Sequence, residues 1–165
     1  MIEIIDISES KLWDEIVQSF KDYDVYYLSG YVKAFQIHGD GIPQLLYYNK
    51  NGLKAIYVYM KRSTSIDGIY DSITPYGYGG VLFEGDTSKE MLCSFWSTYV
   101  DKMNELSIID NFVRYHPVLA NAALMKEVSE VIDLGKTIAI DLTSPDVIWE
   151  NIVSKNRNMI RKAEK

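Results

Sequence analysis

The sequence has few of the residues that cross-link a chain or bind a metal. It contains a single cysteine, Cys93, so it can form neither an internal disulfide framework nor a cluster of thiolate ligands. Its two histidines, His38 and His116, lie far apart and show no metal-binding spacing. A disulfide-rich domain and a thiolate metal site are therefore excluded, and no metal is expected.

Long hydrophobic runs and a basic N-terminal region are also missing. No apolar run reaches the roughly 18 residues that a membrane-spanning helix needs. The first six residues carry Glu3 and Asp6 but no lysine or arginine, unlike a secretory signal. Together with the lone cysteine, these absences predict a cytoplasmic protein without a transmembrane segment.

Positive charge is scarce except at the C-terminal end. The formal net charge is −6, yet residues 155–165 hold five basic residues against one acid, Glu164. The basic residues are Lys155, Arg157, Arg161, Lys162 and Lys165. The acidic remainder argues against nucleic-acid binding by the whole chain, whereas the basic end allows a local anion site. The alternative is a solvated helix face.

The rest of the composition is that of an ordinary globular protein. It has 165 residues, of which 47% are hydrophobic and 24% charged, which suits one domain with a sizeable core. Apolar periodicity predicts helices over residues 10–20, 29–38, 87–106 and 144–165. Alternating patterns predict strands over residues 43–49, 53–62, 71–83, 108–116, 128–133 and 137–142. This order predicts an α/β (α+β) fold, with a mixed, mostly antiparallel sheet covered by helices.

Local signals set several boundaries. Asn51-Gly52 predicts a two-residue hairpin turn, which places Leu46 opposite Tyr57 and Leu45 opposite Val58. Other signals are Ser29 as the cap of a helix stopped by Gly39, the capping box Thr87-x-x-Glu90, and Ser144-Pro145 at the start of the last helix. Tyr31, Ala34, Phe35 and His38 are expected on the inner side of the second helix. The last helix has no stop signal, which suggests a chain that continues or a terminus that frays.

The stretch 71–83 is the most unusual in composition. Gly77, Gly79 and Gly80 alternate with Tyr76 and Tyr78, so bare backbone lies beside flat rings with hydroxyl groups. One interpretation is a bulged strand with a tight turn and half-buried tyrosines. The other is a wall that faces a substrate.

The end of the strand 108–116 offers the other candidate site residues. Arg114 is suited to a bidentate contact with a carboxylate or phosphate, or to a salt bridge with one of the protein's own acids. His116 is a candidate general base, although the sequence shows no carboxylate paired with it.

Three segments, 73–80, 112–117 and 154–163, resemble in order and spacing the N-terminal half of FemAB-type proteins. These are aminoacyl- or acyltransferases of the GNAT superfamily, and the resemblance runs from about Tyr27 to Lys165. It implies a GNAT-like fold in which residues 1–165 form one domain, the N-terminal half of a two-domain protein. The whole protein would transfer an acyl or aminoacyl group to an amine of a cell-wall (peptidoglycan) or polysaccharide precursor.

The resemblance also implies partners. The acceptor would be a nucleotide-sugar or lipid-linked precursor, and the donor of the full-length protein would be aminoacyl-tRNA or acyl-CoA. Lys33 lies on a helix that contacts acceptor phosphates in some relatives, or is simply solvated. Arg157 and Arg161 are expected to contact an anion, such as the tRNA backbone, a pyrophosphate or an acidic face of the second GNAT-like domain.

Two features of the sequence argue against catalysis by this chain alone. No glycine-rich loop opens a helix in the way that acetyl-CoA binding requires, so no bound cofactor is expected in this chain. No residue is assigned as catalytic, and this half alone is expected to be inactive. The alternative function is a non-catalytic binding or scaffold module that positions an anionic acceptor or packs on a second domain.

Overall fold

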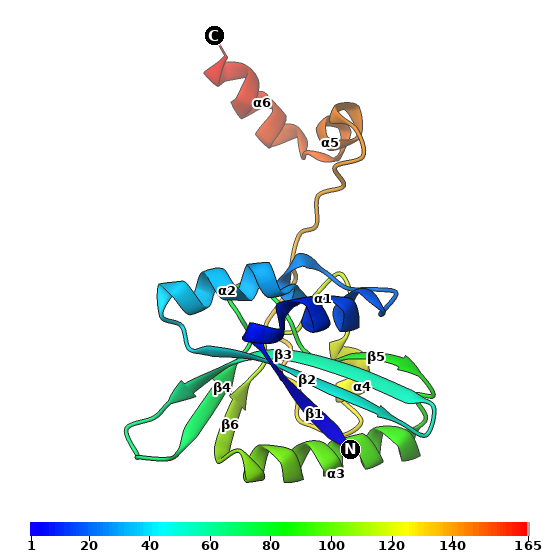
Figure 1. Cartoon of the computed structure of the whole chain (residues 1–165). Helices are drawn as coiled ribbons and strands as arrows, with labels where there is room; N and C mark the ends of the chain where they lie inside the picture. Colours follow the sequence, from blue (N-terminus) through cyan, green and yellow to red (C-terminus); the bar gives the residue numbers. More distant parts are fainter. Residues whose placement is uncertain (165) are drawn as a thin grey trace. The chain divides into compact units, whose positions relative to one another are not determined.

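The computed structural model describes residues 1–164, which fall into two compact units, Met1–Ile132 and Asp133–Lys165 (Figure 1). The first unit contains the whole sheet with its covering helices, and the second contains two helices. That both belong to one GNAT-like domain stays a prediction. No helix in the described part of the chain is both long and apolar enough to cross a membrane.

The first unit is built on a six-stranded sheet. Its strands are β1 (Ile2–Asp6), β2 (Ile42–Lys50), β3 (Leu53–Ser63), β4 (Tyr70–Ile73), β5 (Leu82–Gly85) and β6 (Ile108–Phe112). The strand order is β1-β2-β3-β4-β6, with β5 also paired to β3. All pairs are antiparallel except β4 and β6, which are parallel. The predicted mixed, mostly antiparallel sheet is therefore confirmed.

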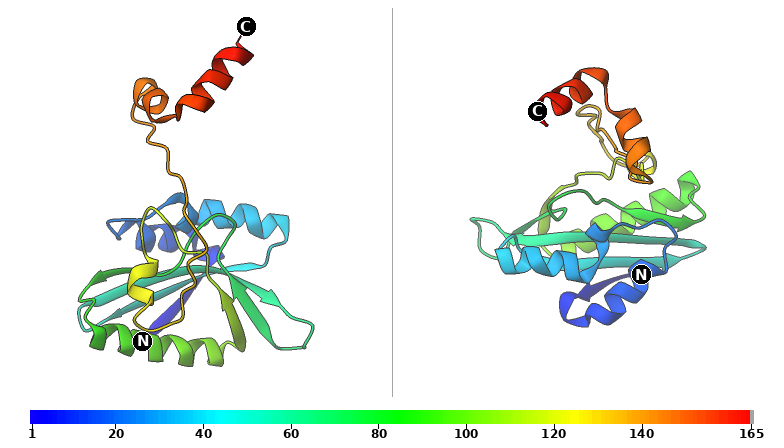
Figure 2. Two further views of the ribbon diagram at one scale, coloured as in Figure 1. Left: turned by 180° about the vertical axis from the view of Figure 1, so that it is seen from behind. Right: turned by 90° about the horizontal axis from the view of Figure 1, so that it is seen from above.

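Helices cover both faces of this sheet (Figures 1 and 2). One face packs against α1 (Ser10–Gln18) and α2 (Ser29–His38), the other against α3 (Lys89–Glu105). Strand β3 shows the alternation clearly, because Tyr57 and Tyr59 join the core under α3 whereas Val58 and Met60 join the core under α1 and α2. Two 3-10 helices, η1 (Ile7–Glu9) and η2 (Val25–Tyr27), and the short α4 (Ala122–Met125) complete the unit.

The predicted hairpin is confirmed in its register. Leu46 lies opposite Tyr57 and Leu45 opposite Val58. Asn51 and Gly52 both have positive φ, 52° and 84°, as a type I′ turn requires. The turn therefore sets the longest strand pairing of the sheet, and with it the position of everything attached to β3.

Several local predictions were wrong. Strand β1 was not predicted. The Ser29 side chain does not cap α2; its hydroxyl donates to Asp14, and the same carboxylate accepts the Ser29 backbone N–H at 2.8 Å. The predicted inner side of α2 is right only in part. Tyr31 and Phe35 pack against the core, whereas Ala34 and His38 are exposed and Ser29 and Val32 are buried instead. Helix α3 begins at Lys89 after Ser88, so the capping box at Thr87 does not form.

The stretch 71–83 was predicted as one strand, and the structure divides it. Strand β4 pairs with one end of β3, at Met60–Ser63, and β5 pairs with the other end, at Leu53–Ile56. Residues 74–81 leave the sheet between these two pairings. Their one ladder contact is a parallel bridge between Gly79 and Tyr115. Residues 74–81 leave the sheet because β4 ends beside β6, whereas β5 pairs again with β3.

The strands predicted over 128–133 and 137–142 do not form. The apolar residues of 137–142 are exposed, as at Ile138 and Leu142, with 88% and 75% of their surface accessible, whereas Val128 and Val131 are partly buried against the core under α3. An alternating pattern becomes a strand only beside another strand that takes its backbone hydrogen bonds. The described residues supply no such neighbour to this stretch.

The second unit contains α5 (Pro145–Asn151) and α6 (Ser154–Ala163) where one continuous helix was predicted. The predicted start is confirmed, because the Ser144 hydroxyl accepts the Val147 N–H and Pro145 opens the helix. The helix breaks at Ile152 and Val153, whose ψ angles of 129° and 143° are extended. No described residue of α5 or α6 is buried.

The buried tyrosines predict how stability depends on pH. Burial raises the pKa of Tyr57 well above its usual value, and it also raises the pKa of Tyr27, Tyr59 and Tyr99. In the unfolded chain these groups ionise near pH 10, whereas in the folded protein they hold their protons. The contribution of these protonated tyrosines to the free energy of unfolding is therefore complete below about pH 10. As pH rises further it is lost, by about 1.4 kcal/mol per pH unit for each tyrosine.

The expected result is a flat free energy of unfolding to about pH 10, followed by a steep fall, with tyrosinate absorbance rising together with unfolding. Urea titrations across this range, read by circular dichroism, measure it. Tyr59→Phe is expected to reduce the slope of this fall by the contribution of one tyrosine, about 1.4 kcal/mol per pH unit. Tyr23→Phe, at an exposed position, is expected to leave the slope unchanged. Ionisation of all 13 tyrosines in a chain that stays folded would contradict this account.

Candidate functional site

The parallel pair of strands opens onto a cavity. Strands β4 and β6 run in the same direction and end side by side at Ile73 and Phe112. A cavity of ≈ 370 Å³ lies beside this edge. It is lined by Gly39, Asp40, Met60, Arg62, Ile73, Thr74, Pro75, Tyr76 and Arg114. The carboxyl ends of parallel strands are common ligand sites, so this cavity is the best candidate in the first unit.

Three charged side chains line the cavity, and their partners differ. Arg62 is bonded to Asp71 at both ends of its fork, with Nε to Oδ1 at 2.8 Å and Nη2 to Oδ2 at 2.7 Å. This contact raises the pKa of Arg62 and neutralises its charge locally. Asp40 contacts the exposed His38 through Oδ1.

Arg114 keeps most of its donors available. Its Nη1 donates to the carbonyl of Gly77 at 3.2 Å, and its backbone N–H donates to the Thr74 hydroxyl at 3.1 Å. The residue is exposed, and no acidic partner is among its contacts in residues 1–164. A guanidinium held in this way can still donate its free N–H groups to a carboxylate or phosphate oxygen.

The structure brings two of the predicted site residues to the cavity and leaves others elsewhere. Tyr76 and Arg114 line it. The Tyr76 ring is 71% exposed and stacks on Phe35 at 6.0 Å, which places a flat aromatic surface at the rim. Tyr78 instead packs against Tyr26 and His116. Lys33 is exposed on α2 and does not line the cavity.

The glycines of 74–81 make room for the protein's own rings. Gly77 has a φ of 97°, and a Cβ there would lie 2.4 Å from the Tyr26 ring. Gly80 has a φ of 99°, and its Cβ would lie 2.7 Å from the Tyr115 ring. The groups that come close to these two glycines are therefore internal side chains. Of the proposed wall, Tyr76 alone faces the cavity.

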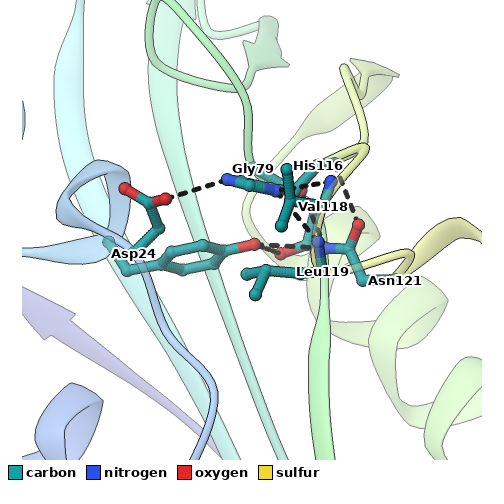
Figure 3. A network of polar contacts seen from close by, with 8 residues as sticks. Asp24, Gly79, His116, Val118, Leu119 and Asn121 are labelled. Carbon is teal, nitrogen blue, oxygen red and sulfur yellow. Dashed lines mark hydrogen bonds and ion pairs between the residues drawn. The ribbon is translucent and has the colours of Figure 1, made fainter. Parts of the chain in front are cut away.

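His116 is the centre of a buried polar network (Figure 3). Its Nδ1 accepts the backbone N–H groups of Val118 and Leu119, at 3.2 and 3.1 Å. Its Nε2 lies 3.0 Å from a carboxylate oxygen of Asp24, which is 92 residues away in the chain. Because Nδ1 accepts, the proton of the neutral ring is on Nε2 and is donated to Asp24. Both ring nitrogens of His116 are therefore engaged within the protein, and its candidate role as a general base stays a prediction.

Asn121 extends this network to the glycine segment. It accepts the His116 backbone N–H at 2.9 Å, and its amide donates to Gly79 at 2.8 Å and to the hydroxyl of Tyr27 at 3.1 Å. Tyr27 in turn donates to the carbonyl of Gly80. Asp24 and Asn121 were not predicted as partners of His116, because no local spacing in the sequence connects them to it.

The arginines of α6, the basic helix of the second unit, contact residues of α5 in the same unit. Arg157 donates through Nη1 to the carbonyls of Trp149 and Glu150, at 3.2 and 2.9 Å, and so caps the end of α5. The guanidinium of Arg161 lies 5.3 Å from the centre of the Trp149 ring. Lys155 and Lys162 are exposed, and Lys165 lies outside the described residues. An anion contact by this helix stays a prediction.

Among residues 1–164 no group of three or more histidine, cysteine, aspartate and glutamate side chains is placed to hold a metal.

No protein-family model matches the chain, and no curated protein matches it. Among solved structures it is similar to the ribosomal-protein-alanine N-acetyltransferase from Brucella melitensis biovar Abortus 2308. The identity is 10% and the TM-score 0.47, over 84% of this chain and 98% of that one. A likeness this distant carries no activity, substrate or cofactor over to the present protein.

Proposed function

We propose that this chain is the acceptor-binding half of a FemAB-type acyl- or aminoacyltransferase of the GNAT superfamily. The observation that carries the proposal is the cavity at the ends of β4 and β6, with the available guanidinium of Arg114 on its wall. An exposed arginine at such a strand end is suited to an acidic group of a substrate. The resemblance of segments 73–80, 112–117 and 154–163 to that family supports the assignment.

The proposal divides the reaction between two halves. Acyl transfer to an amine needs an activated donor, a deprotonated amine and stabilisation of the oxyanion. This half would hold the acceptor, an amine-bearing cell-wall or polysaccharide precursor, through Arg114 and Tyr76. The donor, aminoacyl-tRNA or acyl-CoA, would be handled with the second GNAT-like half. The chain alone is expected to bind acetyl-CoA weakly or not at all.

A second candidate is a binding or scaffold module without chemistry. The observation that favours it is the state of His116, whose two nitrogens are engaged by Asp24 and by backbone N–H groups. The two candidates differ when the second half is present. Transfer of a labelled acyl group to an amine by the two halves together supports the transferase, whereas tight acceptor binding without transfer supports the module.

The acceptor site predicts a specific loss on mutation. Arg114→Gln is expected to weaken binding of UDP-N-acetylglucosamine and of inorganic phosphate about 10-fold or more, because a charge-assisted hydrogen bond is removed. Binding is measured by nuclear magnetic resonance titration, which also locates the ligand. Lys50→Gln, at the exposed end of β2, serves as the matched control that removes one positive charge away from the cavity. Equal affinities for Arg114→Gln and wild type would remove the support for the acceptor site.

A further inference from the structure

We infer that the cavity binds a zwitterion, with an ammonium group at Asp40 and a single carboxylate or comparable monoanion at Arg114. The inference rests on the proposed acceptor site and specifies its ligand class. Asp40 was not among the residues predicted from the sequence. Its place in the cavity comes from the structure alone.

The charge balance of the cavity leads to this class. Arg62 and Asp71 satisfy each other through a two-point contact, so they offer no net charge to a ligand. Two opposite charges are left on the lining, Arg114 and Asp40, of which Asp40 also contacts the exposed His38 through Oδ1 and keeps Oδ2 for a ligand. A dianion such as a pyrophosphate would gain from Arg114 but would also approach the Asp40 carboxylate. A ligand that carries one positive and one negative group satisfies both.

Asp40 is held firmly in place. It directly follows Gly39, which ends α2 with a φ of 99°, and its backbone N–H donates to the carbonyl of Phe35 at 3.0 Å. On its other side Gly41 lies so close to β3 that a Cβ would be 2.7 Å from the Lys61 carbonyl. The side chain of Asp40 is 36% exposed, and within residues 1–164 no hydrogen bond involves its Oδ2. That oxygen can accept an ammonium N–H.

Arg114 is held from a different element. Its backbone is tied to Thr74 and its guanidinium to the carbonyl of Gly77. Two opposite charges that are each fixed by the backbone present a preorganised site, which lowers the entropy cost of binding. The volume of ≈ 370 Å³ is at the small end of ligand pockets and suits an amino acid or one sugar, so that only part of a nucleotide sugar would enter it.

The test uses the full chain and a series of ω-amino acids from glycine to 6-aminohexanoate, because the series spans a range of charge separations. Each is titrated by nuclear magnetic resonance beside the carboxylate and the amine of the same length. The best zwitterion is expected to bind at least 10-fold more tightly than its matched carboxylate or amine.

Two variants separate the charges. Asp40→Asn is expected to weaken binding of the zwitterion about 10-fold while leaving or strengthening that of the carboxylate, because the repulsion is removed. Arg114→Gln is expected to weaken both. Asp67→Asn, in the exposed turn between β3 and β4, is the control with the same change of charge and should alter neither.

The outcomes distinguish the inference from the function beneath it. If zwitterion and carboxylate bind equally and Asp40→Asn changes neither, the inference is wrong, while binding through Arg114 preserves the acceptor site. If no member of the series binds, nor UDP-N-acetylglucosamine nor phosphate, the acceptor site itself is refuted. A zwitterion preference that Asp40→Asn abolishes establishes the assignment.

Discussion

Replacing His116 by leucine is expected to lower the free energy of unfolding by about 3 kcal/mol. The leucine cannot accept the backbone N–H groups of Val118 and Leu119, and the Asp24 carboxylate loses its donor. Each unpaired buried polar group costs about 1–3 kcal/mol, and partial exposure of Val118 and Asp24 keeps the total near the lower end. Urea unfolding read by circular dichroism measures the loss.

His116→Asn separates the two roles of the ring. An asparagine oxygen can accept N–H groups two and three residues ahead, as Nδ1 does now, but its side chain is too short to reach Asp24. We expect this variant to recover about half of the loss. It should also keep the ligand affinity of the cavity, because His116 does not line it. Equal destabilisation by leucine and asparagine would show that the acceptor role of Nδ1 is unimportant.

Gly85→Ala is expected to destabilise the protein by about 4 kcal/mol. Gly85 pairs with Leu53 at the end of β5 and has a φ of 91°, which strains any residue with a Cβ. That Cβ would lie 1.9 Å from the carbonyl oxygen of Gly52, which belongs to the backbone of the hairpin turn. A backbone atom cannot rotate away as a side chain does, so the turn and β5 must separate.

Gly30→Ala is the matched control for this substitution. Gly30 is in the first turns of α2, and a Cβ there meets no atom within 4 Å. We expect it to be neutral or to stabilise by up to about 1 kcal/mol, because alanine is the better helix former. Thermal and urea unfolding of both variants measure the contrast. A Gly85→Ala protein as stable as Gly30→Ala would contradict the close approach of β5 to the turn.

The sequence predicted those parts of the fold that depend on neighbours in the chain. The hairpin register follows from Asn51-Gly52 and from apolar residues a few positions to either side. Helix α2 ends where Gly39 was expected to stop it. By contrast, the apolar alternation in 128–142 predicted strands that need a partner strand, and a local pattern cannot say whether one is present.

The same distinction explains the site. Tyr76 and Arg114 were identified because each stands in an unusual local context, and both line the cavity. In the sequence, Asp40 is an ordinary acidic residue after the end of a helix. Its place in the cavity depends on the packing of β3 against the neighbouring Gly41, which no local pattern shows. Asp24 and His116 are joined by tertiary structure alone. The break in the last helix was hidden for a similar reason, since Arg157 caps α5 from the following helix.

The strand order begins at β1 and ends at β6, and each of these two strands has a neighbour on one side only within the described chain. Such open edges are templates for strand addition between molecules. Here both carry acids, Glu3 and Asp6 on β1 and Asp110 on β6, all of them exposed. Two copies that approach edge to edge therefore meet like charge, which opposes aggregation at neutral pH. That protection weakens when salt screens the acids or acid pH neutralises them, so the colloidal behaviour of the protein is linked to its sheet topology.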